Sequence, residues 1–92
     1  MVEVIKRNGK RETFNKSKVV TAVEKAASEA KIAPKQKEEM AQEIATGVSN
    51  NLKGKKSVKA IEIRKMVLGR LERRSSAAAN AWKKYDQKRR KK

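Results

Sequence analysis

The 92-residue sequence predicts one α+β domain, in which an N-terminal β-hairpin and a short third strand form a small sheet packed against about four helices. Three observations predict this class. The dipeptide Asn8-Gly9 separates two β-prone runs, apolar residues recur at helical spacing through most of the remaining chain, and Pro34 interrupts that helical pattern. The chain is too short for two domains, so we expect a single domain over residues 1–87 and a basic tail over residues 88–92.

The hairpin is the most strongly predicted element. Asn8-Gly9 favours a two-residue type I′ turn, in which both central residues need positive φ. Such a turn places Arg7 opposite Lys10. It also places Lys6 opposite Arg11, so that two like-charge pairs meet across the strands, which is unfavourable without a counter-charge. A bound polyphosphate would supply that counter-charge; the alternative is a solvated tip whose long side chains splay apart.

Four helices are expected after the hairpin, at residues 16–31, from Pro34 to a C′ residue at Gly54, at residues 60–73, and from a cap at Ser75 or Ser76. Residues 57–59 are β-capable and form the candidate third strand. The four expected apolar stripes are Val20, Val23, Ala27 and Ala30; Met40, Ile44, Val48 and Leu52; Ile63, Met66, Val67 and Leu71; and Ala78, Ala79, Trp82 and Tyr85.

The composition excludes several kinds of chemistry. The chain has no His and no Cys, which removes zinc fingers, thiol nucleophiles, disulfides and imidazole bases. Most carboxylates fall on expected exposed helix faces, and no pair is placed for acid–base work or metal binding, so we expect no enzyme, no catalytic residue and no metal site. No apolar run approaches the ~18 residues of a membrane span, and a cytoplasmic location is the default expectation.

The net charge of +16 favours an anionic partner. The excess is uneven, because residues 70–92 carry ten basic and only two acidic side chains. Nucleic acid, nucleotide phosphates or an acidic protein surface would each fit this charge. The alternative is that the basic surface serves only solubility.

Three polar residues follow the basic hairpin tip: Glu12, Asn15 at the strand-to-helix junction, and Lys18 in the first helical turn. A carboxylate accepts hydrogen bonds, an amide donates and accepts, and a helix N-terminus favours phosphate. The simpler interpretation is that Asn15 caps the helix, Lys18 is a surface residue and Glu12 balances local charge.

Residues 4–19, which read Val-Ile-Lys-Arg-Asn-Gly-Lys-Arg-Glu-Thr-Phe-Asn-Lys-Ser-Lys-Val, resemble the opening signature of the ATP-cone family. Residues 79–85 resemble the family's closing Ala-x-x-Tyr-x-x-Tyr helix, with Trp82 in place of the first Tyr. Residues 63–67 resemble the Ile-x-x-x-Val of its third helix. The resemblance therefore spans the whole chain.

ATP-cones are regulatory nucleotide sensors, found in ribonucleotide reductases, in the repressor of reductase genes and on some archaeal kinases. The resemblance implies a three-stranded sheet covered by helices that binds ATP or dATP, with Mg as an accompanying ion, without hydrolysis. It assigns phosphate contacts, the adenine edge and a pocket wall to seven residues. These are Lys6, Arg7, Lys18 and Arg89 for the phosphates, Glu12 and Asn15 for the adenine edge, and Val4 for the wall.

The sequence departs from the family pattern in three places. Asn8 stands where Asp is usual, Lys59 or Ala60 where Ser or Thr is frequent, and Asp86 where Arg follows the last Tyr. We also expect a stand-alone sensor, because the sequence contains no effector domain. Such a sensor must report through self-association or through another, unidentified protein.

A second hypothesis is a small basic nucleic-acid-binding protein on the same fold, and nucleotide control of such a protein would combine the two hypotheses. Glu12 and Asn15 distinguish the two hypotheses, since a backbone binder gains nothing from a carboxylate within its basic patch. For the isolated protein, we expect weak, non-specific binding to nucleic acid that is lost by physiological ionic strength.

Overall fold

A computed structural model describes the backbone of residues 2–90 and the side chains of residues 2–85. It confirms the predicted α+β class, with a three-stranded sheet and four helices. The side chains of the expected tail, residues 88–92, lie outside the described part of the chain. The elements are β1 (Glu3–Ile5), β2 (Arg11–Thr13), α1 (Lys16–Glu29), α2 (Pro34–Asn51), β3 (Ser57–Lys59), α3 (Ala60–Arg74) and α4 (Ser76–Arg90).

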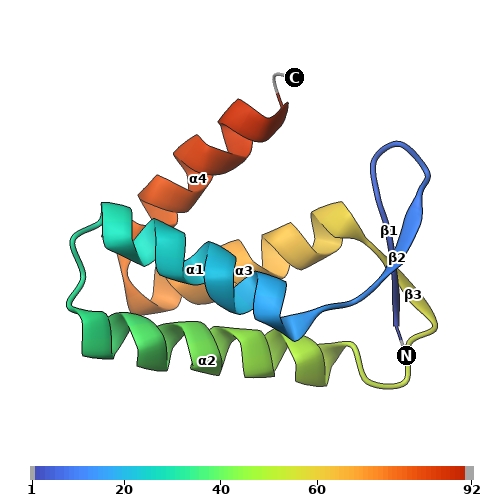
Figure 1. The fold of residues 1–92 in the computed structure, drawn as a ribbon, viewed down its shortest axis with the longest axis horizontal. Coiled ribbons are helices and arrows are strands. Elements are labelled where there is room, and N and C mark those ends of the chain that lie inside the picture. Colours follow the sequence, from blue (N-terminus) through green and yellow to red (C-terminus); the bar gives the residue numbers. More distant parts are fainter. Residues whose placement is uncertain (1, 91–92) are drawn as a thin grey trace.

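The helices form a layered bundle with the sheet at one end (Figure 1). Helices α1 and α3 each contact both α2 and α4, so α1 and α3 lie between α2 and α4. The second half of α4 projects away from the bundle (Figure 1). Strand β1 is central in the sheet order β2-β1-β3, antiparallel to β2 and parallel to β3. Helices α1 and α2 supply the long crossover that a parallel pair needs.

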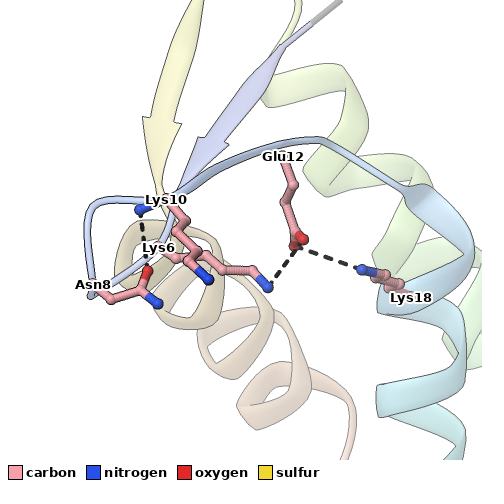
Figure 2. A network of polar contacts seen from close by, with 5 residues as sticks. All are labelled: Lys6, Asn8, Lys10, Glu12 and Lys18. Carbon is pink, nitrogen blue, oxygen red and sulfur yellow. Dashed lines mark hydrogen bonds and ion pairs between the residues drawn. The ribbon is translucent and has the colours of Figure 1, made fainter.

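The hairpin register differs by one residue from the predicted register. The Lys6 N–H donates to the Lys10 carbonyl at 2.8 Å, and the Gly9 N–H donates to the Lys6 carbonyl at 2.9 Å. Gly9 has a φ of 86°, whereas Asn8 lacks the positive φ that a type I′ turn requires. The loop is therefore a three-residue turn with glycine in the left-handed region. Instead of adopting positive φ, Asn8 accepts a hydrogen bond from the Lys10 N–H at 3.1 Å (Figure 2).

This register corrects the predicted charge pairs and decides which side chains share a face. Lys6 lies opposite Lys10, not Arg11, and Arg11 lies opposite Ile5. Glu12 lies opposite Val4. Because side chains alternate along a strand, Val4, Lys6 and Glu12 all point to one face of the hairpin. The predicted two-residue turn would have placed Glu12 on the opposite face.

Helix α1 ends through its own C-terminal cap, before the predicted break at Pro34. The Ile32 N–H donates to the Ala27 carbonyl and the Lys31 N–H to the Ser28 carbonyl, both at 3.0 Å. This is a Schellman motif, with Lys31 at the left-handed position (φ 60°) that glycine usually occupies. The predicted end of α2 is also wrong by one residue. Gly54 was predicted as the C′ residue, directly after the C-cap, but the C-cap is Leu52 and Gly54, with a φ of 83°, lies two residues beyond it.

The core is built almost entirely from the helices. The predicted stripe of α2 is confirmed, since all four of its residues are buried. In α1 the buried face is turned slightly, because Val19 and Ala26 are buried while the predicted Val20 and Ala30 are only partly so. Tyr85 was predicted on the apolar face of α4 but is 38% exposed, because the second half of α4 projects away from the bundle (Figure 1).

Candidate functional site

A cavity of about 500 Å³ lies between the hairpin and the helices α1 and α3, with Trp82 of α4 also in its wall. Six of the seven predicted site residues line this cavity, and the side chain of the seventh, Arg89, lies outside the described residues. The structure thus brings together residues from β1, the hairpin loop, β2 and α1. The six are Val4, Lys6, Arg7, Glu12, Asn15 and Lys18.

Glu12 is the centre of the polar network in this cavity. Its Oε2 lies 3.0 Å from the Lys6 Nζ, and its Oε1 lies 3.6 Å from the Lys18 Nζ (Figure 2). The Lys6 hydrogen bond, together with the nearby charge of Lys18, lowers the pKa of Glu12 below its ordinary value, although partial burial acts in the opposite direction. The carboxylate is therefore ionised at neutral pH and bridges two elements.

Asn15 is the N-cap of α1. Its Oδ1 accepts a hydrogen bond from the Ser17 N–H at 2.9 Å, so the capping interpretation is confirmed. The cap also fixes the amide orientation, because only the oxygen can accept from a backbone N–H. This leaves the amide NH2 as the donor that Asn15 can offer to a ligand at the cavity wall.

Cations dominate the charged lining of the cavity. The charged residues that line it are four cations and one carboxylate: Lys6, Arg7, Lys18, Arg64 and Glu12. The first turn of α1 carries no acidic residue, so the positive end of its dipole adds to the same field. This arrangement attracts an anion with several charges.

The structure adds residues to the site that sequence reasoning missed. Arg64 reaches the cavity from α3, and an apolar surface completes it. Arg64 and Trp82 both lie in the stretches that resemble the family motifs, but the sequence alone gave no reason to place either at the cavity. Ala60, one of the two residues that could occupy the position where the family resemblance predicts Ser or Thr, lines the cavity with only a methyl group. The apolar surface consists of Val4, Phe14, Val19, Ala22, Ala60, Ile63, Val67 and Trp82.

Within the described residues, no group of three His, Cys, Asp or Glu side chains is gathered in a way that could hold a metal ion. None of the helices in this described part of the chain has the length and hydrophobicity of a membrane span.

The structure is thus a small α+β domain whose polycationic pocket, with an apolar wall, lies between a hairpin and a helix N-terminus and suits an anionic ligand. Residues 2–91 match the ATP cone domain family, and the chain belongs to this family. ATP-cone domains bind ATP or dATP as a regulatory ligand.

Three curated relatives match over 77 residues, or 84% of this chain. Each is named transcriptional repressor NrdR. They come from Synechococcus sp. strain JA-3-3Ab (38% identical), Synechococcus sp. strain JA-2-3B'a(2-13) (35%) and Picosynechococcus sp. strain ATCC 27264 / PCC 7002 / PR-6 (34%). The match covers 38%, 42% and 41% of these proteins, so the chain spans about two-fifths of their length.

Proposed function

We propose that the cavity binds ATP or dATP as a regulatory ligand, without hydrolysing it. The observation that carries this proposal is the convergence of six residues, predicted from the sequence signature, on one cavity of about 500 Å³. Family membership supports the same ligand class.

The phosphates would bind at the basic end of the cavity. Lys6 and Arg7 approach from the hairpin, and Lys18 from the first turn of α1. Charge-assisted hydrogen bonds from ammonium and guanidinium groups suit phosphate oxygens. Arg89 is a further proposed phosphate contact. Any Mg would arrive bound to the phosphates, because the one cavity carboxylate among the described residues is already paired with two lysines.

The base would be recognised by Glu12 and Asn15. The Glu12 carboxylate can accept a hydrogen bond from the adenine amino group, and the Asn15 amide can donate to the neighbouring ring nitrogen. Guanine presents a carbonyl in place of the amino group, and an ionised Glu12 repels that carbonyl oxygen. The apolar wall that includes Val4 and Trp82 suits the faces of a purine.

Calorimetric titration with ATP tests the phosphate assignment. The double variant Lys6→Ala/Arg7→Ala should lose at least about tenfold in affinity, since each charge-assisted contact contributes about 1–3 kcal/mol. The matched control is Lys53→Ala/Lys56→Ala, which removes the same charge from two exposed residues outside the cavity and should bind as the parent does. If the Lys6→Ala/Arg7→Ala protein binds ATP as tightly as the parent, the site is wrongly assigned.

For the output of the sensor, we propose control of self-association or of a protein partner. Light scattering with and without ATP tests the first of these. A change in mass on ATP addition supports self-association, and a constant mass contradicts it.

Nucleic-acid binding is the second candidate function, because the relatives that match this chain are named transcriptional repressors. The net charge of +16 and the basic C-terminal residues favour contacts with a phosphate backbone. We expect duplex binding at low salt, falling steeply with ionic strength, and weaker after removal of residues 88–92. Tight, salt-tolerant, sequence-selective binding would instead make nucleic acid the main ligand.

A further inference from the structure

We propose that Glu12 makes the phosphate site selective for whole nucleotides, because in the free protein its carboxylate holds the lysines that a bare polyphosphate would need. This inference rests on the proposed function and assigns Glu12 a second role, rejection of polyphosphates that carry no base.

The geometry places Glu12 between the two proposed phosphate-binding lysines. Lys6 follows β1 and Lys18 lies in α1, so the lysines come from separate elements and Glu12 joins them, one carboxylate oxygen to each (Figure 2). Both pairs lie at the cavity wall. An internal carboxylate therefore already neutralises part of the charge that attracts phosphate.

A polyphosphate without a base must break both ion pairs and then place its own negative charge beside an unpartnered carboxylate. An adenine nucleotide breaks the same pairs but offers its amino group to Glu12 in exchange. The whole nucleotide thus compensates the carboxylate, whereas phosphate alone does not. The Glu12 side chain is 35% exposed, so water replaces part of the lost interaction and the discrimination is moderate.

The other face of the hairpin provides a matched control. Glu3 pairs with Arg11 at 3.4 Å, and its side chain is 50% exposed. Glu3 does not line the cavity. Replacing either Glu by Gln changes the net charge equally, but only Glu12→Gln releases the cavity lysines.

The test is calorimetric titration of sodium tripolyphosphate into the parent, Glu12→Gln and Glu3→Gln proteins. Glu12→Gln should bind tripolyphosphate about three- to tenfold more tightly than the parent, the range set by two partly exposed ion pairs. Glu3→Gln should stay within about twofold of the parent, and the ratio of ATP affinity to tripolyphosphate affinity should be lower for Glu12→Gln than for the parent. The proposal is overturned if Glu12→Gln gains nothing, if Glu3→Gln gains as much, or if neither the parent nor Glu12→Gln binds tripolyphosphate.

The outcomes separate this inference from the proposed function. If the parent prefers ATP over GTP and Glu12→Gln gains no tripolyphosphate affinity, the function stands and the inference fails. If the parent binds no ATP while Glu12→Gln gains tripolyphosphate affinity, the function fails and the block by Glu12 stands. If Glu12→Gln does not fold, NMR titration of the Glu12 carboxyl in the parent protein provides the test. The pKa of Glu12 should rise when tripolyphosphate binds the two lysines, and an unchanged pKa overturns the proposal.

Discussion

The helical bundle and the hairpin differ in how their residues are held. Ile44, Val48 and Leu71 of the bundle are at most 1% exposed, and the bundle supplies most of the buried side chains. In the hairpin, Val4 is buried, while the charged side chains of Lys6 and Glu12 are 47% and 35% exposed. Stability therefore resides chiefly in the helices, and the hairpin carries the polar groups of the site at low cost to folding. Substitutions in the two regions should have separable effects.

The largest expected effect comes from the bundle. Leu71→Ala removes a fully buried side chain from α3 and should lower the free energy of unfolding by about 2–5 kcal/mol, measured by urea denaturation. The control is Leu68→Ala on the same helix, where the side chain is only partly buried and the loss should be smaller. Equal losses for the two variants would contradict the division between a buried core and its surface.

The second effect concerns the hairpin turn. Gly9→Ala forces a side chain into the left-handed region, where no heavy atom would clash with it, so the cost is conformational and about 1–2 kcal/mol. Gly69→Ala is the matched control, because Gly69 lies exposed within α3 with equally open space; there the change should stabilise the protein by about 0.5–1 kcal/mol.

ATP titration of Gly9→Ala sharpens this comparison. If Gly9→Ala shifts the hairpin register by one residue, Glu12 moves to the other face of the hairpin, and ATP affinity should fall by more than the loss of stability explains. If the Gly9→Ala protein is destabilised but binds ATP as tightly as the parent does, the hairpin register does not determine the ATP site.

The fold was predictable because strong local signals agree with one another. The spacing of Met40, Ile44, Val48 and Leu52 identified the buried face of α2, and Asn8-Gly9 located the hairpin. The register was not predictable, because the same dipeptide fits a two-residue turn and a three-residue turn with glycine at its last position. One residue of difference reversed the face on which Glu12 lies.

The motif predicted which residues gather at the cavity, but it did not predict their contacts. The sequence placed Glu12, Asn15 and Lys18 close together; it could not show that Glu12 pairs with both lysines, since this depends on where α1 lies beside the hairpin. Arg64 was missed because it reaches the cavity only through the packing of α3. Tyr85 was misplaced because helical spacing does not show where a helix leaves its neighbours.

The smallest expected effect is on protonation. The folded-state pKa of Glu12 is lowered, so its ion pairs stabilise the protein above the unfolded-state pKa, and this contribution is lost as pH falls through the folded-state pKa. Carbon-13 NMR should show that pKa rising in Lys6→Ala, and rising less in Lys18→Ala, because the Lys6 hydrogen bond is the larger cause. A larger rise in Lys18→Ala would contradict the geometry in Figure 2.

The most direct test of the central claim, that one face of the hairpin recognises both base and phosphates, is the affinity of the unmodified protein for ATP against GTP. Calorimetry should show saturable ATP binding and GTP affinity lower by at least about tenfold, because the guanine carbonyl meets the ionised Glu12. Equal affinities would show that the cavity recognises phosphates alone, and would contradict the assignment of Glu12 and Asn15 to the base.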